Sequence, residues 1–212
     1  MKTEDLIISL VADQTRPPAS SRHMLGLLLP LALLVAFGIF VYTLDMREDF
    51  MLALGDWHYL AKIAVAASVA AIGLMLVARV ARPEIAPAGL PVWILAALLP
   101  LAAGIAVESV TLPTSEWSRY AMGEAAIYCL TLVPLISLAP LAATLLALRH
   151  GAPQSPTAAG AVAGFAAGGL GALIYALHCN NDSPFYVAIW YLMAIGIVTL
   201  AGAVLGRSVL RW

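Results

Sequence analysis

Long apolar runs separated by short polar segments dominate the pattern of this chain. Six of them reach or approach the length of about 20 residues that an α-helix needs to cross the hydrocarbon core of a bilayer. Short connections between the runs leave little chain for a domain outside the membrane. The pattern therefore predicts an all-α integral membrane protein in which residues 24–212 form six transmembrane helices. The runs are Met24–Leu44, Tyr59–Val80, Leu90–Val107, Ala125–Leu148, Ala158–His178 and Phe185–Leu205.

The composition supports the same class. Hydrophobic residues make up 62% of the 212 residues and charged residues only 11%, whereas a soluble domain carries about 25% charged residues. The first run does not resemble a cleavable signal peptide, because it begins only at Met24 and is followed by "DMREDF" instead of a small-residue cleavage pattern.

The distribution of basic residues predicts the orientation. If the N-terminus lies inside, eight of the eleven lysines and arginines fall on inner segments and three on outer segments. Because cytoplasmic segments carry the excess of basic residues, we expect both termini in the cytoplasm of a bacterium and the protein in its inner membrane. The inner residues are Lys2, Arg16, Arg22, Arg79, Arg82, Arg149, Arg207 and Arg211, and the outer ones are Arg47, Lys62 and Arg119.

The interior of the runs holds no ionisable residue near the expected midplane, where transporters and proton pumps usually carry one. The charged residues lie near the ends of runs, and their long side chains are expected to reach the headgroups. Prolines inside the runs indicate kinks, which neighbouring helices accommodate. The residues near run ends are Lys62, Arg79, Glu108, Glu124 and His178, and the prolines are Pro30, Pro100, Pro134 and Pro140.

The fifth run contains "GAVAGFAAGG", in which Gly160, Gly164 and Gly168 are spaced by four. Glycine at this spacing lets another helix approach closely, and structural packing is the interpretation that we adopt. At about 100° per residue, Cys179 lies about 20° from Gly168 around the helix. If the helix continues that far, Cys179 faces the packed side.

The two cysteines, Cys129 and Cys179, reach the same, outer side of the membrane in this topology. Disulfides persist in the periplasm, so one interpretation is a thiol pair that oxidises reversibly. A second is a soft-metal site for Cu(I) or Zn, in which His178 or His58 joins the thiolates. A third is two small buried residues that pack as hydrophobes. The chain lacks a CxxC motif, which weakens an interpretation as a thiol oxidoreductase.

Residues 1–23 form a distinct segment before the first run. Leu6, Ile7, Leu10 and Val11 make one apolar stripe, and "TRPPASS" then ends any helix. Such an amphipathic helix lies on the lipid surface or binds a groove of another protein. The segment is not basic, which favours the groove of a partner with a positively charged surface.

The combination of "DLIISLVAD" before six predicted membrane helices, Cys129, and "LHCNNDSPFYVAIWY" resembles the NrsF family of membrane-embedded anti-sigma factors. The resemblance covers essentially the whole chain. It implies a regulator, not an enzyme, that holds an extracytoplasmic-function sigma factor inactive and does not itself bind nucleic acid. It also implies that the two cysteines sense heavy-metal or oxidant stress, and that the tail binds the sigma factor. The tail residues concerned are Asp5, Leu6, Ile7, Leu10 and Asp13.

Two other classes of function remain open from the residues. A metal or small-solute transporter would need polar groups at the midplane. A membrane thiol oxidoreductase would need a quinone site and a partner thiol protein. No cofactor is certain, and a soft metal ion would act as the signal.

Overall fold

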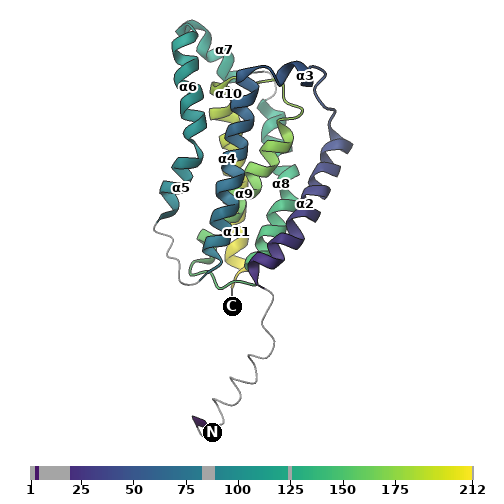
Figure 1. The fold of residues 1–212 in the computed structure, drawn as a ribbon, viewed down its shortest axis with the longest axis vertical. Helices are drawn as coiled ribbons and strands as arrows, with labels where there is room; N and C mark the ends of the chain where they lie inside the picture. The colour runs from purple at the N-terminus through teal and green to yellow at the C-terminus, as the bar shows by residue number, and fades with distance from the viewer. Residues whose placement is uncertain (1–2, 5–19, 83–88, 124–125, 212) are drawn as a thin grey trace.

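In a computed structural model, the structure describes residues 3–4, 20–82, 89–123 and 126–211. All the secondary-structure elements of these residues are helices, joined by turns and loops (Figure 1). The long helices are α2 (Ser21–Thr43), α4 (Trp57–Val80), α8 (Ala126–Leu148), α9 (Pro156–Tyr175) and α11 (Leu192–Val209). The shorter elements are α3 (Phe50–Ala53), α5 (Leu90–Ala97), α6 (Leu99–Thr111), η2 (Thr114–Glu116), α7 (Trp117–Met122), α10 (Pro184–Tyr186) and the π-helical turn η3 (Val187–Tyr191).

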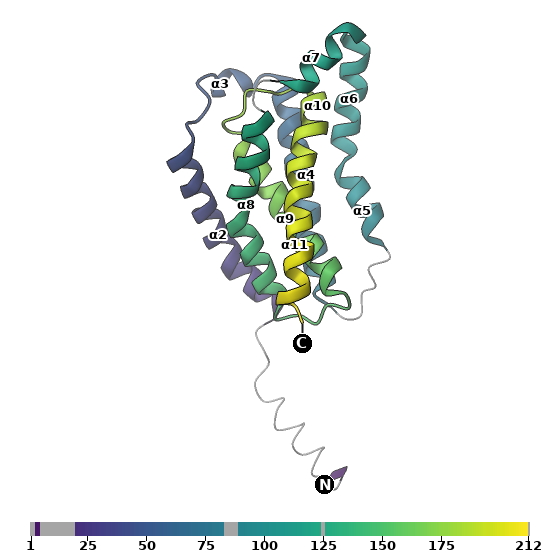
Figure 2. The ribbon, with the colours of Figure 1, turned by 180° about the vertical axis from the view of Figure 1, so that it is seen from behind.

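The described residues include five helices long and apolar enough to cross a membrane. The fifth extends from Pro184 to Val209 through α10, η3 and α11. A sixth span exists if α5 and α6, which meet at an angle of 41°, count as one. The helices form an elongated bundle, with the C-terminus and the start of α2 at one end and α3, α7 and α10 at the other (Figures 1 and 2). We call these the terminal end and the cysteine end. The all-helical prediction is confirmed. The start of α2 and the end of α11 lie at the same end of the bundle.

Side-chain caps define where several helices begin. Ser20 accepts a hydrogen bond from the backbone N–H of His23 at the start of α2. Ser155 does the same for α9, and Asp56 for α4. Each cap satisfies one of the N–H groups that a helix start leaves without an intrahelical partner.

Proline acts differently in the different spans. The third span breaks at Leu98, two residues before Pro100, because proline lacks an N–H and its ring clashes with the carbonyl four residues earlier. Pro30, Pro134 and Pro140 instead lie inside continuous helices. Of the prolines expected to produce kinks, only Pro100 lies beside a break between two helices.

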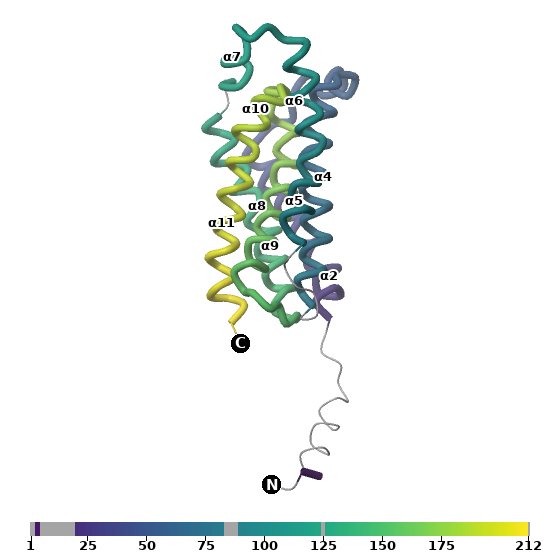
Figure 3. Tube along the Cα trace, turned by 90° about the vertical axis from the view of Figure 1, so that its left-hand side faces the viewer, coloured from purple at the N-terminus to yellow at the C-terminus, as the bar shows by residue number. Residues whose placement is uncertain are grey.

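Helix α9 occupies the centre, between α4 and α11 (Figure 3). Its glycines permit this position, because a Cβ on Gly160 would collide with the carbonyl oxygen of Gly202 on α11. On another side, a Cβ on Gly169 would strike the backbone of Ala70 on α4. The close packing that the glycine spacing predicted is thus confirmed, on two sides of α9.

Two residues expected to reach the headgroups do not do so. The side chain of Lys62 is 0% exposed and that of Glu108 only 3%. Both are buried because they have charged or polar partners at the cysteine end, and a paired charge does not need the solvent. The prediction for these two residues was wrong, since the sequence pattern did not show the partners.

Candidate functional site

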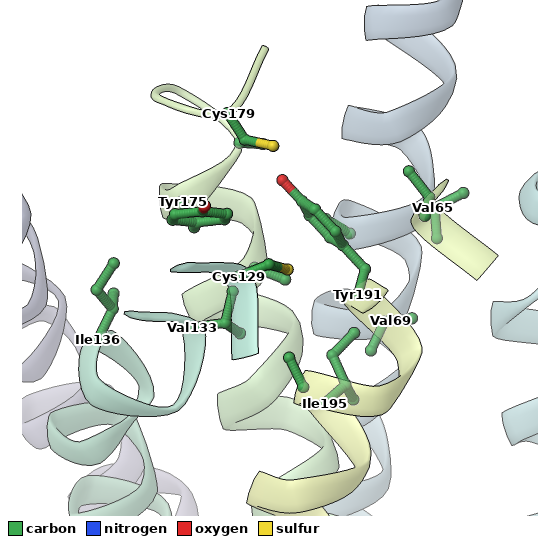
Figure 4. Packing of buried hydrophobic residues seen from close by; sticks show 14 of the residues in the cluster. Val65, Val69, Cys129, Val133, Ile136, Tyr175, Cys179, Tyr191 and Ile195 are labelled. Carbon is green, nitrogen blue, oxygen red and sulfur yellow. The ribbon is translucent and has the colours of Figure 1, made fainter. Parts of the chain in front are cut away.

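Cys129 and Cys179 lie in one apolar cluster at the cysteine end of the bundle (Figure 4). Cys129 is on α8 and is 0% exposed, and Cys179 follows α9 and is 2% exposed. Both are free thiols in this structure. Three tyrosines from the last third of the chain complete the cluster around them: Tyr175, Tyr186 and Tyr191.

The end of α9 determines where Cys179 points. The α-helix ends at Tyr175, but the backbone N–H of Cys179 still bonds to the carbonyl oxygen of Tyr175 at 3.2 Å. The last turn therefore keeps the helical spacing, and Cys179 faces the packed side as the angular argument from Gly168 required. The Cys179 thiol also donates weakly to the carbonyl oxygen of Asn181, with an S–O distance of 3.8 Å.

Two buried cations hold the loop after Cys179. Lys62 Nζ donates to the carbonyl oxygen of Cys179 at 2.6 Å and to the carboxylate of Asp182. Arg47 Nη1 donates to the same carbonyl oxygen at 3.4 Å and to Asp182 at 2.9 Å. We call Arg47, Lys62 and Asp182 the loop clamp. It ties the segment that carries Cys179 to α4 and to the α2–α3 connection.

The loop clamp is electrostatically compensated. Arg47 also pairs with Asp49, and this hydrogen bond is the main reason why the pKa of Arg47 is raised, against the effect of its burial. The same bond lowers the pKa of Asp49. Both cations lie over the ring of Tyr59, at 5.0 Å for Arg47 and 5.3 Å for Lys62, an arrangement that attracts cations to an aromatic face.

A second polar group joins α4, α6 and the start of α10. His58 Nε2 contacts Glu108 at 3.0 Å, and Ser183 Oγ donates to the other carboxylate oxygen of Glu108 at 3.1 Å. His58 Nδ1 contacts Asp56 at 2.9 Å, and the pKa of Asp56 is lowered, chiefly by the backbone N–H of His58. The segment after Cys179 is thus anchored at Asp182 and again at Ser183.

An open pocket of about 650 Å³ lies against this segment. Its walls come from the α3–α4 connection, from α7 and from the loop after Cys179. The pocket therefore borders the loop that follows Cys179. Its lining residues are Asp56, His58, Arg119, Tyr120, Met122, Gly123, Asn180, Asn181, Asp182 and Ser183.

The structure does not assemble the suggested metal ligands. His58 uses both ring nitrogens on carboxylates, and His178 Nδ1 contacts the carbonyl oxygen of Asp45 at 2.7 Å. Within residues 3–4, 20–82, 89–123 and 126–211, no group of three or more His, Cys, Asp or Glu side chains is arranged to hold a metal ion. Of the four residues, only Cys129 and Cys179 share the cluster.

Sequence reasoning missed the loop clamp and the tyrosines. One signal for the loop clamp was present in the sequence. Lys62 is a charged residue about one turn inside the second apolar run, and Asp182 lies shortly before the sixth. The predicted sigma-factor ligands Asp5, Leu6, Ile7, Leu10 and Asp13 lie outside the described residues.

Comparison with known proteins adds independent information. The model of the family described as NrsF, negative regulator of sigma F, matches residues 10–212. The probable anti-sigma-F factor NrsF of Azospira oryzae is 33% identical to this chain, over 100% of both chains. The anti-sigma-F factor NrsF of Caulobacter vibrioides is 30% identical, also over 100% of both. No solved structure matches the chain. The names of the relatives are those of regulators, not of enzymes, as the sequence led us to expect.

Proposed function

Because this chain belongs to the NrsF family of negative regulators of sigma F, we propose that it is an inner-membrane anti-sigma factor. It holds an extracytoplasmic-function sigma factor inactive at the cytoplasmic face and releases it under stress. The match to the family over residues 10–212 carries this proposal. The cysteine end then faces the periplasm, and the terminal end faces the cytoplasm.

The tail supplies the contact with the sigma factor. In this proposal the apolar stripe of Leu6, Ile7 and Leu10 enters a groove of the partner, and Asp5 and Asp13 face its basic rim. Helix-in-groove recognition uses this spacing of anchors. The two proline residues of "TRPPASS" keep the tail helix separate from α2, so that the tail can bind a partner beside the membrane.

The cysteine pair supplies the signal. We favour reversible oxidation of Cys129 and Cys179 to a disulfide, since the two thiols share one cluster while His58 and His178 are engaged elsewhere. Capture of a heavy-metal ion, Cu or Zn, by the two thiols together with His178 is the competing chemistry. Either modification changes the packing of the residues around the end of α9.

The packing of α9 offers a path for the signal to the terminal end. A shift of the Cys179 loop acts directly on α4 through Lys62. Helices α4 and α9 are in backbone contact where Gly73 meets Ala166. At the terminal end, the N–H of Ala152, in the connection before α9, bonds to the carbonyl oxygen of Ala81 after α4. A coupling free energy of about 1–3 kcal/mol between the two ends would change occupancy of the sigma factor by about 5–150-fold.

Capture of the sigma factor by membranes tests the first half of the proposal. The full chain should co-purify with its sigma factor, and a chain without residues 1–20 should not. Replacing Leu6 and Leu10 by Asp should have the same effect, because each buried leucine contributes about 1.5–3 kcal/mol and a micromolar complex has about 8 kcal/mol in all. Ser9→Asp, on the other face of the predicted tail helix, is the matched control. Undiminished capture by the double variant would disprove binding by the tail.

Release under stress tests the second half. Cys129→Ser, Cys179→Ser and the double variant should all retain the sigma factor at rest and fail to release it, each to the same degree. Equal, non-additive defects are expected of residues that act as one unit. His178→Ala separates the chemistries: it should abolish a metal response but leave a disulfide response nearly intact. Normal release by both single cysteine variants would rule out the pair as the sensor.

A further inference from the structure

Among the residues that the structure describes, three tyrosine hydroxyls in the cysteine cluster have no hydrogen-bond partner. They belong to Tyr175, Tyr186 and Tyr191, each 0% exposed. A buried hydroxyl without a partner loses its bonds to water and gains nothing in return, so such groups are rare in proteins. Three of them in one cluster, beside the only two thiols of the chain, indicate a site for a ligand.

The three tyrosine rings lie beside one another in the cluster that holds the two thiols. The Tyr191 ring lies 6.1 Å from that of Tyr175 and 6.4 Å from that of Tyr186, measured between centroids. All three tyrosines belong to the same buried cluster as Cys129 and Cys179. In Figure 4 the oxygen of Tyr191 points toward Cys179.

The backbone at Tyr191 is unusual as well. It is the last residue of the π-helical turn η3 (Val187–Tyr191), which interrupts an otherwise α-helical span. Single π-helical turns cost hydrogen-bond geometry and occur frequently at functional sites. Here the turn lies where the span delivers the Tyr191 side chain to the cluster.

The chemistry of the cluster restricts the ligand. Phenol groups donate hydrogen bonds, so the ligand must offer oxygen lone pairs. All the buried residues of the cluster are uncharged, and its nearest cation, Lys62, is already paired with Asp182. A charged ligand would lose its hydration without compensation. A small, neutral, oxygen-rich molecule fits these requirements, and beside two thiols such a molecule reacts if it is an oxidant.

We propose that Tyr175, Tyr186 and Tyr191 bind a small neutral hydroperoxide against Cys129 and Cys179 and orient it for oxidation of the pair. This rests on the proposed role of the two cysteines as the sensor. The oxidant approaches from the open pocket, whose wall includes Asn181, the residue that accepts the Cys179 thiol hydrogen bond.

The reaction balances with hydrogen peroxide as the oxidant. The sulfur of Cys179 attacks one oxygen, the O–O bond breaks, and the thiol proton leaves with the other oxygen as water. The sulfenic acid at Cys179 is then attacked by the sulfur of Cys129. The S–S bond forms, the S–O bond breaks, and the second thiol proton leaves with that oxygen as a second water. The tyrosine hydroxyls donate to the oxygen on which negative charge develops in each step, which lowers the barrier.

Tyrosine-to-phenylalanine variants of the full chain in lipid nanodiscs test this site. Each keeps the ring and removes only the hydroxyl. The readout is the rate of disulfide formation between Cys129 and Cys179, followed by mass spectrometry. Two oxidants are compared: hydrogen peroxide, and iodine, which oxidises thiols without accepting a phenol hydrogen bond to an oxygen. Tyr128→Phe, next to Cys129 but 64% exposed, is the matched control.

The triple variant Tyr175→Phe, Tyr186→Phe, Tyr191→Phe should react with peroxide about 100-fold more slowly, the usual consequence of losing donors to a developing oxyanion. Its reaction with iodine should stay within about twofold of wild type, as should both reactions of the control. The unchanged reaction with iodine would show that the triple variant is folded and still brings the two thiols together.

A peroxide rate unchanged in the triple variant, or an equal loss with both oxidants, would overturn the site. So would a wild-type pair that iodine oxidises and peroxide does not, although the pair would then still stand as a sensor. Failure of the proposed sensor is distinct, because it is read from the cysteine variants and the release of the sigma factor.

Discussion

The two ends of helix α9 are held by different kinds of contact. Toward the terminal end, Gly160 and Gly164 lie directly against the backbone of α11 around Gly202. At the other end, the chain after Tyr175 is held by the loop clamp and by the cluster of thiols and tyrosines. One end is backbone packed on backbone, and the other is a set of polar and reactive side chains.

This difference indicates a division of labour. Packing between glycines has no chemical group that a change of redox state or metal concentration alters, and close-packed interiors transmit strain instead of absorbing it. The cysteine end contains both thiols of the chain, whose covalent state such a change can alter. In the proposed function, the cysteine end therefore receives the signal, and the glycine contacts of α9 carry it to the terminal end as a movement of a stiff helix.

Removing the charge of Lys62 should have the largest effect of the substitutions that test this division. Lys62→Met leaves the carboxylate of Asp182 with Arg47 alone and removes the closest donor to the carbonyl oxygen of Cys179. Breaking a buried ion pair costs about 3–5 kcal/mol. We expect a loss of this size in the free energy of unfolding, measured by chemical denaturation in detergent micelles.

Arg119→Gln is the control for Lys62. Arg119 pairs with Glu116 at 3.4 Å, but its side chain is 83% exposed. Exposed pairs contribute about 0–1 kcal/mol. If Lys62→Met destabilised the protein no more than Arg119→Gln, the loop clamp would not stabilise the cysteine end, and the contrast between the two ends of α9 would fail.

The glycine end should respond to volume instead of charge. A Cβ on Gly202 would collide with the carbonyl oxygen of Gly160, so Gly202→Ala must push α11 away from α9. Overpacking of this kind costs about 1–3 kcal/mol. The expected result is a loss of that size in unfolding free energy, together with weaker coupling between thiol oxidation and release of the sigma factor.

Gly196→Ala, on the same helix, has no atom of the described residues within 4 Å of its added Cβ. It should leave both the unfolding free energy and the coupling near wild type. If the two alanine variants behaved alike, the close approach of α9 and α11 would have no energetic importance.

Most of the fold could be predicted from the sequence, because each helical span is a run of apolar residues. The structure begins α2 at Ser21 and ends α4 at Val80, within a few residues of the predicted bounds. The break in the third span could be located near Pro100 but not distinguished from a kink. That distinction depends on what packs against the helix, which a linear pattern does not contain.

The site was accessible only in part. The cysteines could be assigned to one side, since the topology follows from the alternation of spans. The pairing of Lys62 with Asp182 joins residues 120 positions apart, and periodicity within a run cannot show such a partner. The tyrosines could not be predicted for a similar reason. Tyr175 and Tyr191 read as ordinary apolar positions, and only the arrangement of α9 against η3 brings their rings together.

The smallest effect is expected from Asp56, which lies at the cysteine end but outside the loop clamp. Asp56 caps α4 and holds His58, and these bonds lower its pKa. A carboxyl group with a lowered pKa stabilises the fold fully above the pKa of the unfolded chain, about 3.9. This contribution is lost as the pH falls through the lower pKa of the folded protein.

Asp56→Ala should therefore cost about 0.5–2 kcal/mol near neutral pH, the usual effect of removing an N-cap. Asp56→Asn should cost less, because asparagine retains the cap. The difference in unfolding free energy between wild type and Asp56→Ala should shrink as the pH falls below about 4. A difference that stayed constant over that range would show that the carboxylate charge contributes nothing there, and that the cysteine end depends on Lys62 and Arg47 for its electrostatic stabilisation.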